Sequence, residues 1–245
     1  MPETDAIVIR NLTKRFGGKT AVDGVNLSVK KGELFALLGV NGAGKTTLIR
    51  MLCSLLRPSG GDALLLGKSI TKSPGEVRKI IGVSPQETAV APNLNVRENL
   101  ELMCGDHGIG RRESLLRMQD MVERLSLQSV LNQSAGTLSG GWQRRLSIAM
   151  SLISRPEILF LDEPTLGLDV LARSELWEVV RSLKGSVTVV LMTHYMEEAE
   201  QLSDRIGIMR NGRLLCVGTA AECMERAGSD RFEEAFVKIV KGETL

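Results

Sequence analysis

The residues from position 39 to 46 have the composition of a phosphate-binding loop. Their order, Gly-Val-Asn-Gly-Ala-Gly-Lys-Thr, matches the pattern G-x-x-x-x-G-K-[ST]. The glycines let the backbone curl around phosphate groups with its N–H groups inward. Lys45 brings a positive charge to the β- and γ-phosphates, and Thr46 offers a hydroxyl group to Mg²⁺. A chance match is expected in about 1–2% of chains of this length, so the loop predicts nucleotide binding.

Two carboxylates, Asp162 and Glu163, end the apolar run at residues 158–161. At the end of a buried strand, Asp162 is placed to hold the Mg²⁺ shell. Glu163 could polarise the attacking water, a role that phosphoryl transfer requires. An isolated Asp-Glu pair at a strand end is more often a solvated turn. Beside a phosphate loop the catalytic interpretation is favoured, so we predict Asp162 as a metal ligand and Glu163 as the base.

His194 follows the apolar run at 187–192, and Gln86 follows the run at 80–83. Ligands of α/β sheets bind at the carboxyl ends of the strands, so both side chains are candidates there. The imidazole could hydrogen-bond the γ-phosphate or orient the water, and the amide could reach Mg²⁺ or the water. A single His is as often structural, and a single Gln in a loop usually has no special role. Both assignments depend on position, and His107 lacks even that support.

The segment Leu-Ser-Gly-Gly-Trp at 138–142 lies between the phosphate loop and the acidic strand end. It opens a predicted helix, and its glycines and helix N-terminus offer backbone N–H groups to an anion. The chain therefore carries two phosphate-binding edges, the phosphate loop and this turn. One ATP needs only one edge of each kind.

Phe16 is one of few aromatic residues in a chain with 3% Phe, Trp and Tyr. In the predicted loop before Val22 it could stack on a base, or it could plug the core beneath the antiparallel strands. The sequence favours neither. Trp177 is predicted to pack within a helix.

The elements around these residues are predicted from apolar periodicity. Alternation at 25–29 predicts a half-exposed antiparallel strand, and the continuous run at 34–38 predicts a strand covered on both faces. The latter leads into the phosphate loop, followed by a helix at 46–56. Further strands are expected at 80–83, 158–161, 187–192, 206–209 and 214–217, the last two joined by the hairpin signal Asn211-Gly212. Strands alternating with helices predict an α/β sheet.

The segment from 85 to 155 has little strand signal and three predicted helices. The first begins near Asn95, whose spacing to Glu98 indicates a capping box. The second spans 111–125, and the third begins at the Ser-Gly-Gly turn and ends before Pro156. The residues expected on one apolar face of the second helix are Leu115, Met118, Val122 and Leu125.

Composition excludes several classes of protein. A length of 245 residues with 43% hydrophobic residues fits one large domain, and a net charge of +2 gives no lead toward nucleic acid. The cysteines, at 53, 104, 216 and 223, form no C-x-x-C pair, so reduced thiols are expected. No apolar run approaches the roughly 20 residues of a membrane span, and the polar, acidic first residues do not resemble a signal peptide.

These motifs, in this order, resemble those of the nucleotide-binding subunit of an ATP-binding cassette (ABC) transporter, over nearly the whole chain. The phosphate loop corresponds to Walker A, 158–163 to Walker B, 138–142 to the signature motif and 167–169 to the D-loop. Gln86 corresponds to the Q-loop glutamine and His194 to the switch histidine, and Phe16 stands where the family places its adenine-stacking aromatic. Short segments at 84–87, 193–200 and 232–237 look like the drug- and lipid-export branch that includes daunorubicin-resistance-type exporters.

The resemblance implies an α/β fold with a P-loop NTPase (RecA-like) core, an antiparallel β subdomain and an inserted helical subdomain at about 86–155. A single ATP-binding domain would cover 1–245, with a short C-terminal extension at 219–245. The expected catalytic residues are Glu163, His194 and Gln86, and the expected Mg²⁺ ligands are Thr46, Gln86 and Asp162. The expected nucleotide contacts are Phe16, Val22, Gly39, Val40, Asn41, Gly42, Ala43, Gly44, Lys45, Thr46, Thr47, Ser139, Gly140 and Gly141.

The implied mechanism needs two chains paired head to tail, as a homodimer or with a related subunit. Each ATP would lie between the Walker A of one chain and Ser139, Gly140 and Gly141 of the other. The implied partners are integral membrane permease subunits, with no nucleic acid. The implied location is the cytoplasm, at the cytoplasmic face of the inner membrane. Residues 89–92 are a candidate contact with those subunits, although such a loop also packs on its own domain.

Two residues depart from the family pattern. Trp142 stands where the signature motif usually has Gln, with Gln143 next; the backbone donors are kept, so only the packing at the helix start should change. Phe16 replaces the commoner Tyr and loses only a hydroxyl group. The alternatives to an exporter ATPase are a soluble ABC ATPase acting on DNA or the ribosome, and a non-hydrolysing nucleotide sensor. The first usually carries two cassettes or long inserts, and the second conflicts with Glu163 and His194.

Overall fold

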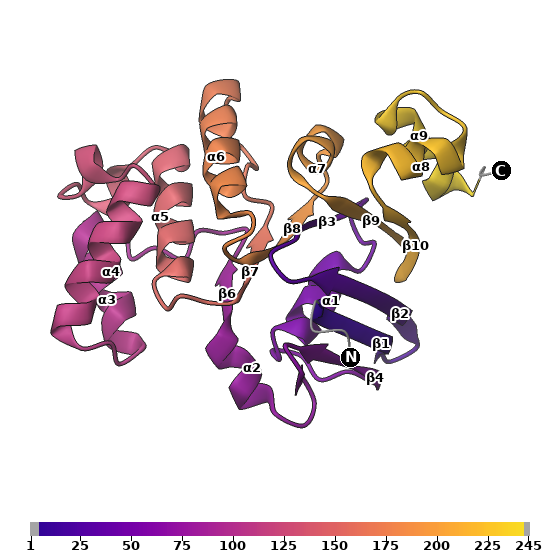
Figure 1. Ribbon diagram of the computed structural model, residues 1–245, viewed down its shortest axis with the longest axis horizontal. Helices are drawn as coiled ribbons and strands as arrows, with labels where there is room; N and C mark the ends of the chain where they lie inside the picture. The colour runs from indigo at the N-terminus through magenta and orange to yellow at the C-terminus, as the bar shows by residue number, and fades with distance from the viewer. Residues whose placement is uncertain (1–4, 243–245) are drawn as a thin grey trace.

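A six-stranded sheet carries the phosphate loop and the acidic strand end. The computed structural model describes residues 5–242, which excludes the acidic first residues considered above. The strand order is β10-β9-β3-β8-β7-β6, parallel except for β10 (Figure 1). These strands are β3 (Leu34–Gly39), β6 (Ile81–Ser84), β7 (Ile158–Asp162), β8 (Thr188–Thr193), β9 (Arg205–Arg210) and β10 (Arg213–Gly218). The α/β fold of a P-loop NTPase predicted from the sequence is confirmed.

A second, antiparallel sheet packs beside the first, in the order β2-β1-β4-β5. Its strands are β1 (Asp5–Phe16), β2 (Lys19–Lys30), β4 (Gly60–Leu65) and β5 (Lys68–Ser69). Buried side chains of β1, β2, β3 and α1 (Lys45–Leu52) form one core between the two sheets. The predicted strand at 25–29 is part of the longer β2. Phe16 is the last residue of β1 and pairs with Lys19, so the prediction that it lies in a loop was wrong.

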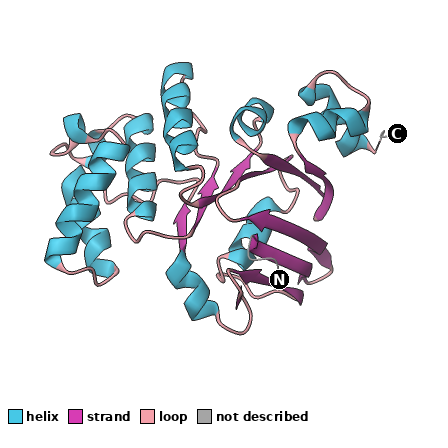
Figure 2. Ribbon diagram, viewed as in Figure 1, coloured by secondary structure: helices cyan, strands magenta, loops and turns pink. Residues whose placement is uncertain are grey.

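Three helices follow β6 in the sequence: α3 (Val96–Asp106), α4 (Arg111–Arg124) and α5 (Gly140–Leu152). They gather at the end of the molecule away from the antiparallel sheet (Figure 2). The capping box of α3 is confirmed, because Asn95 Oδ1 accepts from Glu98 N and Glu98 Oε2 accepts from Asn95 N. Short 3-10 turns at Gln128–Val130 and Ala135–Thr137 lead into α5.

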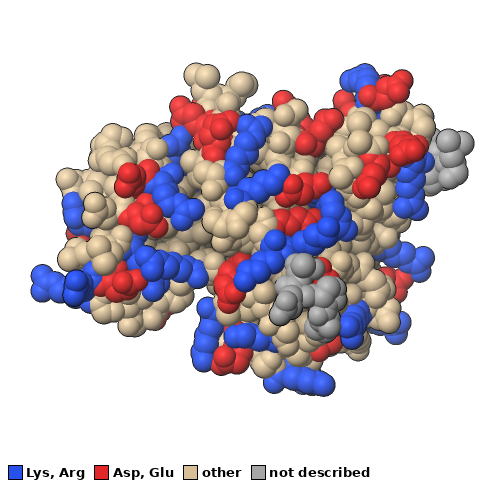
Figure 3. Space-filling view, viewed as in Figure 1, with Lys and Arg blue, Asp and Glu red and all other residues tan. Residues whose placement is uncertain are grey.

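The remaining helices flank the sheet. They are α2 (Pro74–Ile80), α6 (Val170–Leu183), α7 (Met196–Leu202), α8 (Ala220–Ala227) and α9 (Phe232–Lys241). Buried residues of α8 and α9 form a core with β9 and β10. Within residues 5–242, no helix combines the length and the apolar character needed to cross a bilayer. Basic and acidic side chains are interspersed across the face in view (Figure 3).

Two details of the structure differ from the sequence expectations, and a third agrees with them. Helix α1 ends at Leu52 rather than at 56, and the left-handed Ser54 (φ 56°) turns the chain away. Leu115 is 57% exposed, so the apolar face of α4 was predicted one turn too long; Met118 is buried. The four cysteines are free thiols, as expected.

Candidate nucleotide-binding site

A cavity of about 500 Å³ lies at the carboxyl edge of the parallel strands, where β3 and β7 end. It brings together the phosphate loop, the acidic strand end and Gln86, which are far apart in the sequence. Its lining residues are Phe16, Lys19, Thr20, Ala21, Asn41, Gly42, Ala43, Gly44, Lys45, Thr46, Thr47, Gln86, Asp162, Glu163, Asn211 and Gly212.

The phosphate loop is packed tightly against β2 and the β9–β10 hairpin. Gly44 caps α1 with φ 105°, and a Cβ there would lie 2.4 Å from the carbonyl oxygen of Ala21, so only glycine fits. The hairpin residue Gly212 donates its N–H to the carbonyl oxygen of Ala43 at 2.8 Å. These contacts fix the loop before any ligand binds, with the N-terminus of α1 facing the cavity.

Lys45 is held in place by the loop itself. Its Nζ donates to the carbonyl oxygens of Gly39 at 2.5 Å and Val40 at 3.5 Å. Burial lowers the pKa of the Lys45 amine, while the charges of Glu163 and Asp162 act in the opposite direction. A phosphate chain in the cavity would give this partly desolvated amine an anionic partner.

The acidic end of β7 presents two carboxylates of different environment. Burial raises the pKa of Asp162, and the neighbouring Glu163 raises it further, while Lys45 and Arg144 oppose the shift. Glu163 is buried and left-handed, with φ 48°, a conformation that a non-glycine residue adopts at a cost. Its N–H donates to the carbonyl of Met192 on β8 at 2.9 Å, which holds this backbone in place.

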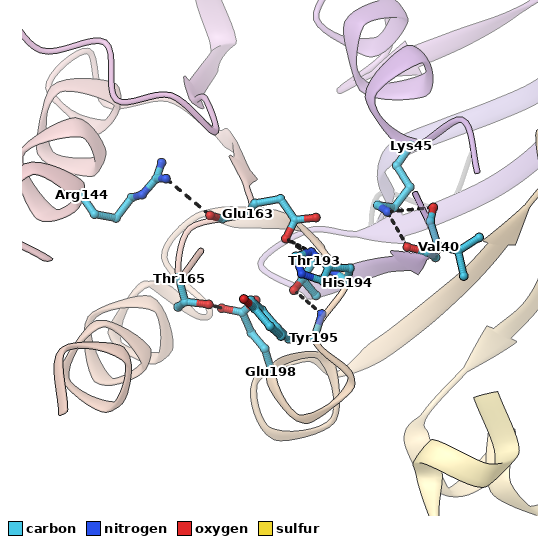
Figure 4. A network of polar contacts seen from close by, with 10 residues as sticks. Val40, Lys45, Arg144, Glu163, Thr165, Thr193, His194, Tyr195 and Glu198 are labelled. Carbon is cyan, nitrogen blue, oxygen red and sulfur yellow. Dashed lines mark hydrogen bonds and ion pairs between the residues drawn. The ribbon is translucent and has the colours of Figure 1, made fainter. Parts of the chain in front are cut away.

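His194 is paired with Glu163. Its Nδ1 lies 2.7 Å from Glu163 Oε2, and its backbone N–H also donates to that oxygen at 3.4 Å (Figure 4). The structure therefore brings the predicted base and the predicted switch histidine into direct contact. The contact orients the Glu163 carboxylate, and His194 itself lies outside the lining of the cavity.

Arg144 links the helical part to this edge of the sheet. This buried guanidinium on α5 donates to the carbonyl oxygens of Pro85 and Gln86, both at 2.6 Å. A third, longer bond at 3.5 Å reaches the carbonyl of Glu163. In Figure 4, Glu163 lies between Arg144 on one side and Lys45 on the other.

Glu198 on α7 is a carboxylate with no solvent exposure. Its Oε1 accepts hydrogen bonds from Thr165 Oγ1 at 2.9 Å and from Trp177 Nε1 at 3.3 Å, while Oε2 has no hydrogen-bond partner among residues 5–242. Burial raises the pKa of Glu198, and the polar side chains of Thr193, Thr165 and Trp177 beside the carboxylate partly offset that shift. The carboxylate thus joins the segment after Glu163 to the helix after His194.

The Ser-Gly-Gly turn lies apart from the cavity. Ser139 caps α5 without a side-chain hydrogen bond, and none of Ser139, Gly140 and Gly141 lines the cavity. The turn packs instead beside the D-loop and α6, since a Cβ on Gly140 would lie 3.5 Å from Leu168. Trp142 packs on the helical core beneath the guanidinium of Arg145, which lies 5.0 Å from its ring.

Three other predicted contacts are Phe16, Val22 and the loop at 89–92. Phe16 is 50% exposed at the rim of the cavity, so the alternative of a core plug is excluded. Val22 does not line the cavity, because its side chain is buried between the sheets; Thr20 and Ala21 line it instead. In the loop at 89–92, Val90 packs on the helical core. The side chain of Asn99 holds this loop by hydrogen bonds to the backbone of Ala91.

Several residues of the site were missed by the sequence reasoning. Arg144, Thr165 and Glu198 give no local signal, because their partners lie on distant segments. The hairpin Asn211-Gly212 was predicted as a turn but not as part of the site. Its signal was available, since a turn that follows a strand parallel to β3 must lie near the phosphate loop.

The comparisons with known proteins bear on this site directly. Residues 22–166 match the family model described as ABC transporter. The chain belongs to the ABC transporter family. It is 44% identical to the daunorubicin resistance ATP-binding protein DrrA3 of Streptomyces coeruleorubidus, over 93% of this chain and 72% of that protein. It is 39% identical to the probable multidrug ABC transporter ATP-binding protein YbhF of Escherichia coli, over 98% of this chain and 42% of that protein.

The fold agrees with solved ABC structures. The ATP-binding subunit of an ABC transporter superposes with a TM-score of 0.84 at 26% identity, covering 96% of this chain and 99% of that one. This ABC chain therefore binds and hydrolyses ATP as a subunit of a transporter. The alternatives of a soluble ATPase acting on DNA or the ribosome, and of a non-hydrolysing sensor, are excluded.

Proposed function

We propose that this ABC ATPase works as a head-to-tail dimer that powers export through separate membrane permease subunits. One observation carries the dimer: the phosphate loop lines the cavity, whereas Ser139, Gly140 and Gly141 do not. An ATP held by Lys45 and Thr46 thus leaves the anion-binding turn of its own chain unused. A second copy, or a related subunit, turned head to tail would place its own turn over that ATP.

The residues around the cavity have different roles in ATP binding and hydrolysis. Lys45 and the loop N–H groups bind the phosphates, and Phe16 offers its exposed ring to the base. Glu163 accepts the proton of the attacking water, while His194, 2.7 Å away, holds the carboxylate in position. The strained backbone of Glu163 is kept in place by Met192 on the neighbouring strand.

A magnesium ion fits the residues at this edge. Thr46, Gln86 and Asp162 line one cavity and offer hydroxyl, amide and carboxylate oxygens, the ligands that hard cations prefer. Burial and Glu163 raise the pKa of Asp162, so this carboxylate is stabilised by an added cation. When bound, the ion neutralises charge on the phosphates. We propose these three residues as its ligands.

Permease subunits are proposed because an ATPase subunit of a transporter needs a partner that forms the path through the membrane. The chain would then sit at the cytoplasmic face of the inner membrane. The exported substrate is proposed to be a drug, a lipid or a polysaccharide, and the relatives named for daunorubicin resistance and multidrug transport favour a drug. Co-purification with a permease after mild detergent extraction, followed by its identification, tests this part of the proposal.

The catalytic assignment is tested by Glu163→Gln. Glutamine keeps an oxygen acceptor for His194 but cannot take the proton, so ATP turnover should fall by roughly 10²–10⁴-fold. The variant should form an ATP-dependent dimer, measured by size-exclusion chromatography with light scattering.

Glu157→Gln is the matched control, because the exposed Glu157 directly precedes the same strand at its opposite end. Its turnover should equal that of the unmodified protein. Normal turnover in Glu163→Gln would overturn the assignment of the base, and a monomer at saturating ATP would overturn the dimer.

A further inference from the structure

Arg144 is a buried cation whose hydrogen bonds all go to backbone carbonyls. It is 5% exposed, yet it forms no ion pair within residues 5–242. Its fork of donors instead reaches Pro85 and Gln86 at 2.6 Å each, and Glu163 at 3.5 Å. Guanidinium groups are rigid planar forks, so these bonds fix the three carbonyls relative to one another.

The acceptors belong to the two segments that carry the chemistry. Pro85 and Gln86 follow β6 and bear the amide proposed for Mg²⁺, and Glu163 bears the proposed base. Burial lowers the pKa of Arg144, while the negative charges of Asp162 and Glu198 raise it. The cost of burying this cation is therefore partly offset by the carboxylates of the site, rather than by a carboxylate on its own helix.

The next residue, Arg145, provides a comparison within the same helix. Arg145 is also buried, but it donates to the carboxylate of Glu175 at 2.6 Å and to the carbonyl of Leu125 at 3.4 Å. It also lies over the ring of Trp142. Its partners are thus on α6, in the segment after α4 and on α5 itself. Two adjacent buried arginines face different neighbours, and only Arg144 reaches the nucleotide site.

The position of Arg144 in α5 connects two phosphate-binding edges. It lies three residues after Gly141, in the first turns of the helix that the Ser-Gly-Gly turn opens. A second bond, between Ser147 Oγ and Ser84 Oγ at 3.0 Å, joins the same helix to β6. Because a helix moves largely as a rigid unit, a displacement of its N-terminus is passed to Gln86 and Glu163 through these bonds.

We propose that Arg144 is a positioning residue that couples the nucleotide bound at Ser139–Gly141 to Gln86 and Glu163 of the chain's own site. The inference rests on the proposed dimer, in which the Ser-Gly-Gly turn binds the nucleotide of the partner. Within one chain, Arg144 then sets the geometry of the base according to whether the partner's ATP is in place.

The test compares Arg144→Lys with Arg145→Lys. Both changes keep the positive charge, but lysine cannot span the carbonyls of Pro85 and Gln86 as the fork does. In Arg144→Lys, kcat should fall by about tenfold or more, because small displacements of catalytic groups reduce rates steeply. The KM for ATP should stay within about twofold, since Phe16, Lys45 and Thr46 are untouched. In Arg145→Lys both constants should stay within about twofold of the unmodified protein.

A second readout separates positioning from binding. In the Glu163→Gln background, Arg144→Lys should still form the ATP-dependent dimer, because the Ser-Gly-Gly turn is intact. All variants are assayed at a temperature at which circular dichroism shows each of them folded. A lower kcat then reflects impaired catalysis and not unfolding of the variant.

Equal kcat in Arg144→Lys and Arg145→Lys would overturn the inference. A raised KM with unchanged kcat, or loss of the dimer, would also overturn it, because either result would assign Arg144 to binding. Absence of both turnover and dimer in the unmodified chain would instead overturn the proposed dimeric ATPase, and the inference with it.

Discussion

The buried carboxylate of Glu198 should make the stability of the protein depend on pH. Burial raises the pKa of this group in the folded state, whereas in the unfolded chain it titrates at the ordinary value of about 4.3. Between these two pKa values the folded state binds more protons than the unfolded state. The contribution of Glu198 to the free energy of unfolding is therefore fully present below the pKa of the unfolded chain. It is lost as the pH rises through this window. Glu198→Gln removes the titrating group and with it this contribution.

The magnitude follows from the proton count. One group that is protonated only in the folded state changes the free energy of unfolding by at most about 1.4 kcal/mol per pH unit. Glutamine keeps an oxygen for Thr165 Oγ1 and Trp177 Nε1, but its NH₂ group replaces the oxygen that has no partner. An unsatisfied NH₂ costs roughly 1–3 kcal/mol at every pH. The variant therefore starts less stable in acid and gains on the unmodified protein as the pH rises.

The assay is urea unfolding of both proteins without nucleotide, from about pH 4.5 to about pH 8, a range that lies above the unfolded pKa of Glu. The difference in free energy of unfolding should move in favour of Glu198→Gln with rising pH and then level off. The exposed Glu200 on the same helix is the control, and Glu200→Gln should run parallel to the unmodified protein. Parallel curves for Glu198→Gln would refute the reasoning.

Two further predictions concern Phe16 and Trp142. Phe16→Ala should weaken ATP binding by about 1 kcal/mol or more, the lower end of base–aromatic stacking, as measured in a fluorescent-nucleotide titration. Phe16→Tyr should bind ATP normally. Equal affinity in the alanine variant would mean that the ring does not stack on the base. Trp142→Gln removes a ring that lies under Arg145, so the melting temperature should fall slightly while ATPase activity and dimer formation stay unchanged. A loss of ATPase activity or of the dimer would show that Trp142 has a role beyond packing.

The sequence predicted the residues whose types are fixed by ligand chemistry. The phosphate loop, Asp162, Glu163 and Gln86 were predicted because each lies at or just after the end of a strand, and the parallel sheet brings these strand ends to one cavity. The capping box at Asn95 and the turn at Asn211 were found because their signals lie within four residues. In each case the physical cause is local, so the order of residues along the chain contains it.

The predictions that failed depend on packing between distant segments. The exposure of Leu115 follows from where α4 meets its neighbours, which periodicity within one helix does not contain. Val22 was expected near the nucleotide, but alternation along β2 turns its side chain inward and leaves Ala21 at the cavity. The bonds of Arg144 join residues 58 and 59 positions apart, so no spacing rule reveals them.

The charges at this edge explain why such remote residues are needed. Glu163 and Asp162 lie together at this edge, where burial and, after it, the charge of Glu163 raise the pKa of Asp162. Two cations, Lys45 on α1 and Arg144 on α5, oppose this rise in the pKa of Asp162. Lys45 is the one that phosphates contact, so bound nucleotide competes with the carboxylates for its charge. Arg144 donates to the backbone carbonyls of Pro85 and Gln86, so its positive charge near Asp162 is held by the protein itself and not by a phosphate.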